Sequence, residues 1–440
     1  MIRYNERDDA HFDQQGNTRP GGSNYINTDV SDDGLDRRGF LRCMAWAGTA
    51  TVWTMAGGIL TSCRVNETRG KSIFFVQLSD SHIGFNKAAN KNVTATLQDA
   101  VSKVNALPQN PALVLHTGDI TQLAKPEEFD TANEVLKGLK TDRVFYVPGE
   151  HDVAADSGAG YLQRYGKDAK GGGWHSFDHS GVHFIGLVNV LNLKAGGLGS
   201  LGAEQIAWLS KDVGGLSAST PIVLFAHVPL WTVYPQWGWG TDDSEQALAL
   251  LKRFGSVTVL NGHIHQIMQK VEGQVSFHTA MGTAFPLPAP GTAPAPSPMK
   301  VDPERLKSVL GIADVTFIPG RSSLAVVDST LSGQPPAFEA ANREAMMQRR
   351  TEPNLALQPN QIGIDNFQFT PAVLSVSAGT AVTWLNKDDT PHLVVSTQNK
   401  FKQSGVLDED QRFTVTLTEP GTYDYFCSIH PKMQGQIVVR

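Results

Sequence analysis

The chain has 440 residues, 40% of them hydrophobic, which is enough for two ordinary domains that each bury a core of their own. Its formal net charge of −6 gives no reason to expect nucleic-acid binding, and no Lys/Arg run resembles a polybasic membrane patch. Partners therefore have to be inferred from individual sites.

The N-terminal segment looks like a targeting region. Residues 1–35 are polar, rich in Asn, Asp and Gly, and lack apolar periodicity, which predicts disorder. Residues 36–63 begin with the paired Arg37 and Arg38 and continue into a mostly apolar run from Cys43 to Leu60, which is typical of an export or anchor signal. The arginine pair resembles the twin-arginine (Tat) motif. The alternative is an ordinary signal anchor with a chance arginine pair.

Cysteine use argues against an internal disulfide. The chain has three cysteines, Cys43, Cys63 and Cys427. Cys43 lies in the apolar run, and Cys63 ends a Leu-Thr-Ser-Cys sequence that resembles a lipobox, in which it would carry a lipid. We therefore expect a periplasmic or otherwise extracytoplasmic protein, held at the membrane by residues 43–63 or by a lipid, without an internal disulfide.

From Lys71 onward, strand and helix patterns alternate. Expected strands occupy residues 73–78, 112–115, 143–147, 222–225, 257–260 and 323–327, with further strands within 175–190. Expected helices occupy residues 93–107, 129–139 and 201–213. Several strands end in polar residues, and α/β sheets place their sites at the carboxyl ends of strands.

Two segments in the second half of this region lack that pattern. Phe285 to Pro298 contains six prolines and predicts an extended, polyproline-like insertion. We expect a solvent-exposed loop there, with one lip of an active-site cleft as the alternative. Residues 332–358 are polar and contain proline, which predicts a linker with a short helix at 338–350.

Carboxylates and imidazoles follow successive strands in glycine-containing turns. They form five blocks: Asp80-x-His82, Gly118-Asp119, Gly149-Glu150-His151-Asp152, His227 and Gly262-His263-x-His265. Mixed imidazole and carboxylate ligands suit Fe, Mn or Zn, and seven such ligands exceed the needs of one ion. Two neighbouring ions can hold a phosphoryl oxygen and share a hydroxide nucleophile. The pattern predicts a dinuclear hydrolase site.

The order of these blocks over residues 71–331 resembles the calcineurin-like metallophosphoesterases. The resemblance implies a four-layer α/β sandwich, in which helices flank mixed sheets, and hydrolysis of phosphodiesters or phosphomonoesters by a metal-bound hydroxide. It also implies the metal ligands: Asp80, His82 and His265 for the first ion, Asp119 as the bridge, and Glu150, His227 and His263 for the second. His151 matches the family's proton donor to the leaving group, steered by Asp152. The other histidines of this region are expected to be structural: His116, His175, His179, His183 and His278.

Glu150 departs from this family, which has Asn at that position. Glu adds a methylene group and a negative charge beside Asp80 and Asp119, which would damp the Lewis acidity of the ions. We expect Glu150 still to be a ligand, because it keeps an oxygen donor. The alternative is that its side chain retracts into a salt bridge.

From Gln361 onward, short alternating strands separated by Gly, Pro and Asp turns predict an all-β sandwich. In it, His392 is followed by Cys427-x-x-His430-x-x-Met433, and two imidazoles, a thiolate and a weak thioether form the donor set of blue copper. Residues 359–440 thus resemble the cupredoxins, with a metal loop of the amicyanin type. The resemblance implies one copper ion on His392, Cys427, His430 and Met433, with His430 as a partly exposed electron port toward a redox partner. A sandwich without metal, with a buried Cys and a core Met, is the alternative.

Two functions follow from these patterns. The first is an exported dinuclear-metal phosphoesterase that carries a type 1 copper electron-transfer domain. The alternative is a copper-binding electron carrier whose phosphoesterase-like domain is impaired by Glu150 and acts as a scaffold or partner-binding surface. His151 favours the enzyme, since a proton donor is needed for chemistry and not for metal binding.

Overall fold

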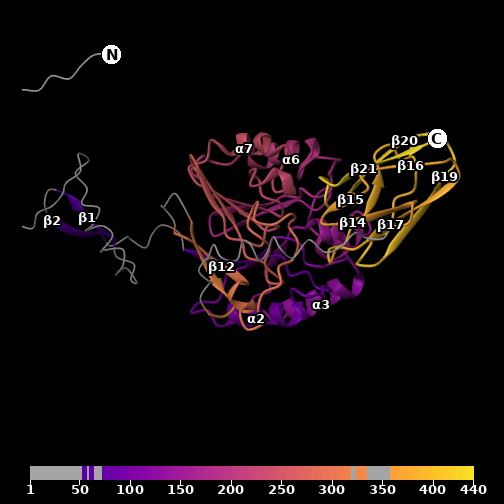
Figure 1. Cartoon of the computed structure of the whole chain (residues 1–440). Coiled ribbons are helices and arrows are strands. Elements are labelled where there is room, and N and C mark those ends of the chain that lie inside the picture. Colours follow the sequence, from indigo (N-terminus) through magenta and orange to yellow (C-terminus); the bar gives the residue numbers. More distant parts are fainter. Residues whose placement is uncertain (1–51, 57–58, 64–71, 319–323, 334–356) are drawn as a thin grey trace, which may run out of the picture. The chain divides into compact units, whose positions relative to one another are not determined.

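A computed structural model of the chain describes residues 52–56, 59–63, 72–318, 324–333 and 357–440 (Figure 1). Residues 1–68 and 69–440 form two separate compact units. In the first unit, β1 (Val52–Ala56) and β2 (Ile59–Cys63) pair in an antiparallel hairpin.

Several expectations fall on other parts of the chain. The Arg37-Arg38 motif, most of the apolar run and the helix expected at 338–350 lie outside the described residues. In the ranges that the structure describes, no helix is both long enough and apolar enough to cross a membrane.

The first domain of the larger unit, residues 72–333, contains two mixed sheets. The strands of the five-stranded sheet, in spatial order, are β13 (Ala325–Thr330), β12 (Gly311–Phe317), β3 (Ile73–Leu78), β4 (Val114–His116) and β5 (Val144–Tyr146). Those of the six-stranded sheet are β10 (Gln269–Glu272), β11 (Val275–Thr279), β9 (Val257–Asn261), β8 (Ile222–Ala226), β7 (Val182–Gly186) and β6 (His175–His179). β3, β4 and β5 run parallel, as do β7, β8, β9 and β11.

Apolar side chains from both sheets form the central core between them. Phe75 of β3 meets Phe184 of β7 edge to face, with ring centroids 5.3 Å apart, and Phe225 of β8 is fully buried in the same cluster. Each such side chain contributes roughly 1.5–3 kcal/mol by leaving water. The inner faces of these strands are therefore apolar, and the candidate ligands follow the strand ends.

Helices cover the outer faces of both sheets (Figure 1). α2 (Val93–Asn105) and α3 (Pro126–Leu136) pack on the five-stranded sheet, and α6 (Ala203–Gly214) and α7 (Ser244–Leu251) pack on the six-stranded sheet. The result is the four-layer α/β sandwich predicted from the sequence. Shorter helical segments complete the domain: α4 (Glu150–Val153), α5 (Ala159–Tyr165), η1 (Pro235–Trp237) and η2 (Leu306–Ser308).

Two expectations about this domain were wrong. The helix expected at 129–139 begins earlier, at Pro126, because proline suits the first helical turn and Glu128 accepts hydrogen bonds from the backbone N–H groups of Leu123 and Lys125 (2.7 and 3.3 Å). The proline-rich segment is not a solvent-exposed loop. The ring of Phe285 lies 4.8 Å from that of His82 and 4.9 Å from that of His265, so the segment starts inside the site.

The second domain, residues 357–440, is the expected all-β sandwich of two four-stranded sheets. The strands of one sheet are β15 (Gln368–Thr370), β14 (Gln361–Asp365), β17 (Thr380–Asn386) and β19 (Arg412–Leu417). Those of the other are β16 (Val373–Val376), β21 (Gln434–Val439), β20 (Gly421–Cys427) and β18 (Val394–Ser396). Trp384 and Tyr425, fully buried, pack edge to face at 5.2 Å between the sheets.

Candidate metal centres

The polar blocks of the first domain meet at one edge of its two sheets. Asp80 follows β3, Asp119 follows β4, and Glu150 opens the short helix α4 after β5. His227 follows β8 directly, and His263 follows β9. Because parallel strands all deliver their carboxyl ends to the same edge, residues from both sheets converge there.

Three of the converging side chains form a first group. Nε2 of His265 lies 3.3 Å from Oδ1 of Asp80 and 3.3 Å from Nε2 of His82. Glu150, His227 and His263 form a second group, in which the carboxylate of Glu150 lies 3.0 Å from Nε2 of His227 and 2.9 Å from Nδ1 of His263. In each group, the candidate donor atoms all lie within 4.8 Å of one another.

Asp119 lies between the two groups. Its Oδ2 is 3.5 Å from Nε2 of His82 and 3.3 Å from Nε2 of His227. A single carboxylate oxygen therefore faces one imidazole of each group, which is the position a bridging ligand needs.

The donor atoms of the second group point at a common space rather than at one another. Oε2 of Glu150, Nε2 of His227 and both ring nitrogens of His263 are buried, and none has a hydrogen-bond partner among the residues that the structure describes. Their mutual distances are short, but their directions do not match hydrogen bonds. Buried polar atoms without partners are costly, so a cation between them fits this donor set.

The outward nitrogens of the histidines are held by oxygen acceptors. Nδ1 of His82 donates to Oε1 of Gln122 (2.9 Å), Nδ1 of His227 to the carbonyl of Thr117 (2.7 Å), and Nδ1 of His265 to the carbonyl of Phe285 (2.6 Å). These bonds place the proton on Nδ1, so the unprotonated Nε2 faces inward and can bind a metal ion. This is the usual arrangement around metal-ligating histidines.

The backbone at the site is strained. Asp80, His82, Asp119, His263 and His265 all have positive φ, between 42° and 71°. Non-glycine residues rarely adopt this conformation, and each instance costs on the order of 1–3 kcal/mol. Such strain clusters at functional sites, where the surrounding structure holds it in place.

One glycine makes the close approach of these turns feasible. A Cβ atom added at Gly149 would collide with the carboxylate and the backbone nitrogen of Asp119. The turn before Glu150 can therefore lie against Asp119 only with glycine at this position.

The site is electrostatically coupled. Burial alone would raise the pKa of Glu150, but the charges of His263 and His227 outweigh it and hold that pKa well below its ordinary value. Burial would likewise lower the pKa of His227, but Asp119 and Glu150 raise it well above the ordinary value. Burial lowers the pKa of His82 to about 3. The carboxylates are thus ionised and the site favours positive charge at its centre.

Glu150 extends into the site, as expected, and its carboxylate lies between two imidazoles rather than in a pair with Lys or Arg. It is only 5% exposed. The extra methylene relative to Asn is accommodated without loss of the donor position.

The expectation that Asp152 steers His151 directly was wrong. Nδ1 of His151 donates to the backbone carbonyl of Gln122 (2.8 Å). Asp152 instead accepts hydrogen bonds from the backbone N–H groups of Gly149 (2.9 Å), Ile120 (3.1 Å) and Thr121 (2.8 Å). Asp152 therefore fixes the loop that carries Asp119 against the turn that carries Glu150, and it positions His151 only indirectly.

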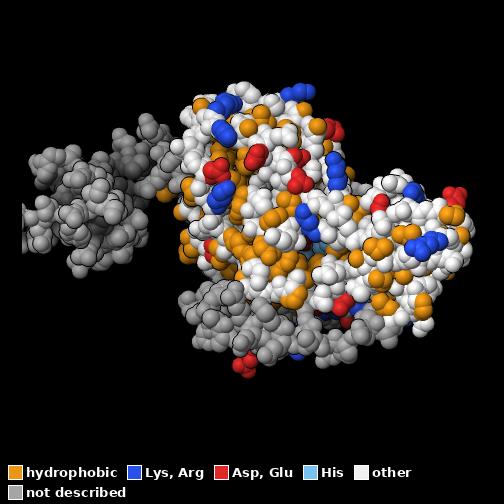
Figure 2. All heavy atoms as spheres, turned by 45° about the horizontal axis from the view of Figure 1, so that its top comes forward, with side chains coloured by type: hydrophobic (Ala, Val, Ile, Leu, Met, Phe, Trp, Pro, Cys, Tyr) orange, Lys and Arg blue, Asp and Glu red, His pale blue; other side chains and the backbone are white. Residues whose placement is uncertain are grey.

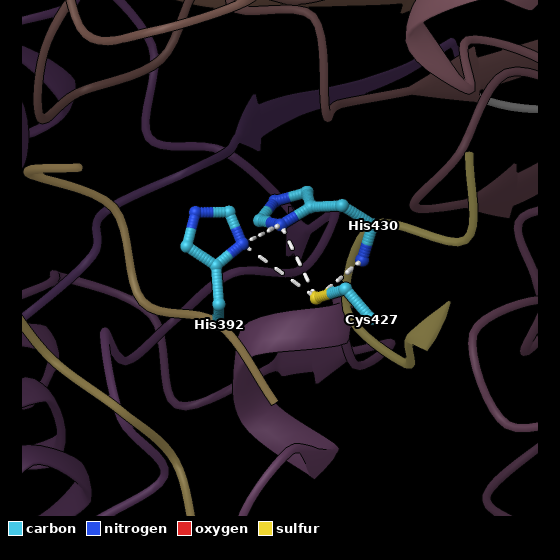
Figure 3. Close-up of side chains that lie close together, drawn as sticks. All are labelled: His392, Cys427 and His430. Carbon is cyan, nitrogen blue, oxygen red and sulfur yellow. Dashed lines mark hydrogen bonds between the residues drawn. The ribbon is translucent and has the colours of Figure 1, made fainter. Parts of the chain in front are cut away.

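In the second domain, His392, Cys427 and His430 converge (Figure 3). Nδ1 of His392 and Nδ1 of His430 lie 3.6 and 3.8 Å from Sγ of Cys427 and 3.2 Å from each other. Nε2 of His392 donates to Asp388 (2.8 Å), which leaves its Nδ1 free for a metal. Met433 is buried in the same core cluster. Two imidazoles and a thiol at these distances fit a copper ion.

The environment of the thiol favours its ionised form. Burial would raise the pKa of Cys427, but the hydrogen bond from His392 and the backbone N–H groups of Leu393 and His430 lower it below its ordinary value. Copper binds the thiolate, so these contacts prepare the ligand.

Comparison with known families agrees with both sites. Residues 75–267 match the family model of calcineurin-like phosphoesterases, and residues 345–439 match that of cupredoxin-like domains. The chain contains a calcineurin-like phosphoesterase domain and a cupredoxin-like domain. The cupredoxin-like match supports a copper ion in the second domain, and the phosphoesterase match supports divalent metal ions in the first.

Individual relatives match one domain at a time. Amicyanin of Paracoccus versutus is 31% identical over 83 residues, 18% of this chain and 62% of that protein. Amicyanin-alpha of Methylorubrum extorquens is 35% identical over 83 residues, 18% of this chain and 70% of that protein. The glycerophosphodiester phosphodiesterase GpdQ of Enterobacter lignolyticus is 26% identical over 227 residues, 49% of this chain and 79% of that protein. The chain thus spans a little under two thirds of the first of these amicyanins.

His430 is partly exposed, as expected. Its ring lies 6.3 Å from that of His151 in the phosphoesterase domain. The metal loop of the cupredoxin therefore lies beside the phosphoesterase site of the same chain.

The remaining histidines of the phosphoesterase domain have structural partners. His116 contacts Oγ of Ser81 (3.1 Å), His183 contacts Asp178 and Asp212 (2.8 and 2.9 Å), and His278 contacts Asp328 (3.0 Å). His175 and His179 lie in the edge strand β6.

Proposed function

We propose that the phosphoesterase domain hydrolyses phosphodiesters with a pair of metal ions. One ion would be held by Asp80, His82 and His265, and the other by Glu150, His227 and His263, with Asp119 between them. The observation that carries this proposal is the set of buried donor atoms of Glu150, His227 and His263, which have no hydrogen-bond partner in the described part of the chain. Fe, Mn and Zn all suit these ligands.

Bound there, two such ions would polarise the phosphoryl group and lower the pKa of an attacking water. The chain's own residues supply the rest. Asp119 and Asp80 hold negative charge on the site, and the backbone N–H of His151 donates to Oδ1 of Asp119 (3.0 Å), which fixes the bridging carboxylate. Hydrogen bonds to backbone N–H groups keep that carboxylate oriented while the ester is attacked.

His151 is placed to move a proton. Its Nδ1 hydrogen is held by the carbonyl of Gln122, so Nε2 is the atom that exchanges a proton with the substrate. Protonated at Nε2, the imidazole would give that proton to the departing alcohol oxygen. General acid catalysis of this kind contributes roughly 10²–10⁴-fold.

The diester preference is supported by the similarity to GpdQ, whose name describes a glycerophosphodiester phosphodiesterase. The position of Glu150 between two imidazoles favours an enzyme over a domain that has become a scaffold. As a ligand, Glu150 would strengthen binding of a harder or more highly charged ion at some cost in Lewis acidity.

Metal dependence is directly testable. The purified chain, stripped with a chelator, should lose hydrolysis of bis(p-nitrophenyl) phosphate, and separate reloading with Mn, Fe or Zn should restore it at least about 100-fold, since the ions supply most of the charge stabilisation. The monoester p-nitrophenyl phosphate serves as the comparison substrate. Reloaded protein no more active than stripped protein would refute the proposal.

For the cupredoxin domain, we propose one type 1 copper ion bound by His392, Cys427 and His430 with Met433 as the weak axial ligand, and a role in electron transfer. The distances among the first three donors and the burial of Met433 support this assignment.

We also propose that the protein is exported, through the paired Arg37 and Arg38 and the apolar run that follows, to an extracytoplasmic compartment. Membrane attachment through residues 43–63, or through a lipid on Cys63, would follow from the same segment. Changing both arginines to lysine keeps the charge and should retain the protein in the cytoplasm, as measured by cell fractionation. Unchanged fractionation of the double variant would exclude twin-arginine export.

A further inference from the structure

Residues of the two domains line a partly open cavity of about 210 Å³ next to the proposed dinuclear site. On the phosphoesterase side it is lined by Glu150 and His263, by Trp237, and by Pro294 to Pro296 of the proline-rich segment. On the cupredoxin side it is lined by Asn366, Phe367 and residues 429–433. Two metal-ligand candidates and the copper loop therefore share one space.

Specific contacts join the domains around this cavity. The backbone N–H of Gly196 donates to the carbonyl of Pro431 (2.6 Å), and Nζ of Lys432 donates to the carbonyl of Gly196 (2.5 Å). On another part of the interface, Lys87 pairs with Glu409 (3.0 Å). Figure 2 shows one face of the molecule with its side chains coloured by type.

The contact reaches the catalytic turn itself. Ala154, at the C-terminal end of α4, packs against the cupredoxin core, and α4 carries Glu150 and His151. The ring of His151 lies 6.3 Å from that of His430. The cupredoxin domain thus covers the side of the site from which His151 acts.

The cupredoxin residues that line the cavity contact the candidate copper ligands or their hydrogen-bond partners. The carboxylate of Asp388 accepts hydrogen bonds from Nε2 of His392 (2.8 Å) and from the backbone N–H groups of Asn366 (2.7 Å) and Phe367 (2.9 Å). The ring of Phe367 lies 4.6 Å from that of His430. Whatever occupies the cavity therefore touches residues that hold the copper ligands.

We propose that the copper loop and Phe367 form the outer wall of the substrate pocket, so that the cupredoxin domain makes the phosphoesterase prefer phosphodiesters with a small second alcohol group. The inference rests on the proposed function and goes beyond it in naming what sets the substrate preference. A cavity of about 210 Å³ is smaller than the roughly 300–1,000 Å³ of ordinary ligand pockets. It accommodates a phosphoryl group with a short alcohol better than one with a second bulky group.

Two substrates with the same leaving group test the size limit. Methyl p-nitrophenyl phosphate and bis(p-nitrophenyl) phosphate both release p-nitrophenolate and differ in the group that stays on phosphorus. Phe367→Ala should raise kcat/KM for the bulky ester relative to the methyl ester by about tenfold, since a change of one or a few methylenes in a pocket is worth about 10–200-fold.

Phe413→Ala is the matched control. Phe413 packs on Trp384 in the same domain core but does not line the cavity. In Phe413→Ala, the ratio of kcat/KM for the bulky ester to kcat/KM for the methyl ester should therefore stay within about twofold of the wild-type ratio. If Phe367→Ala loses its copper absorption, Lys432→Ala replaces it as the test variant, because Lys432 also lines the cavity. Its control is Lys400→Ala, because Lys400 also donates to a backbone carbonyl, that of Thr422, away from the cavity.

A second readout needs no turnover. Inorganic phosphate is titrated into the full chain loaded with copper(II) and with the dinuclear metals. It should shift the copper electron paramagnetic resonance signal, because phosphate at the dinuclear site would lie beside His430. The chain loaded with copper alone should show no shift.

The outcomes separate this inference from the proposed function. If phosphate shifted the copper resonance signal of a chain that hydrolyses no ester, the proposed function would be refuted and the shared pocket would remain supported. Suppose instead that the chain hydrolyses both esters, that Phe367→Ala and Phe413→Ala have the same ratio of kcat/KM for the bulky and the methyl ester, and that phosphate leaves the copper signal unchanged. The shared pocket would then be wrong, while the proposed function would stand. Failure of the metal-loaded chain to bind phosphate would overturn the shared pocket as well.

Discussion

Asp119→Asn should lower kcat/KM for bis(p-nitrophenyl) phosphate by about 10²- to 10³-fold. Asn has the same shape as Asp, but it lacks the negative charge and one of the two carboxylate oxygens. In Asp119, Oδ2 lies 3.5 Å from Nε2 of His82 and 3.3 Å from Nε2 of His227. Losing the bridge weakens the hold on both ions, and several kcal/mol of charge stabilisation correspond to a loss of this size.

Asp130→Asn is the control for the same chemical change. Asp130 is 69% exposed and pairs with Arg164 at 3.0 Å on the surface, a contact worth no more than about 1 kcal/mol. Its activity should match the wild type. An Asp119→Asn protein that binds two ions and hydrolyses the ester at the wild-type rate would remove Asp119 from the mechanism.

Cys427→Ser should abolish the visible copper–thiolate absorption of the copper-loaded chain. The thiolate is the soft ligand that selects copper, and the hydroxyl that replaces it is a poor donor. Cys427 is fully buried, so an added hydroxyl without a partner also costs about 1–3 kcal/mol of stability.

A second variant separates these two effects. Cys427→Ala removes the sulfur without burying a polar group, and it should lose the absorption as completely. Ser428→Ala, at the adjacent position, should keep it. Strong charge-transfer absorption in either Cys427 variant, with copper bound, would show that another residue supplies the thiolate-like ligand and would refute the site.

The clusters of candidate metal ligands could be predicted from the sequence because their residues come in short motifs at strand ends. Asp80-x-His82 and Cys427-x-x-His430 each place candidate ligands on a single turn, and the fold brings those turns close to the other candidate ligands. The alternation of apolar strands and amphipathic helices predicted an α/β domain, and the resemblance to the phosphoesterase family implied its four layers. β12 was missed, although Ala313, Val315 and Phe317 in Gly311–Phe317 offered an alternating signal.

Contacts between distant segments could not be predicted in this way. Gln122 orients both His82 and His151, yet a single Gln in a loop carries no pattern of its own. The bond between Lys432 and Gly196 joins positions in different domains, and no local periodicity encodes it. The direct role given to Asp152 failed for a related reason, because four nearby backbone and side-chain donors around it were invisible in the sequence.

The central claim is that Glu150 is a ligand in a working two-metal site. The measurement that tests it most directly is metal content and phosphodiester hydrolysis, determined on the same preparations of wild type and Glu150→Asn after loading with Mn, Fe or Zn. We expect the wild type to hold about two ions per chain besides copper and to hydrolyse bis(p-nitrophenyl) phosphate. A silent wild type beside an active Glu150→Asn protein would contradict the claim, since it would mark a site switched off by the charge of Glu150.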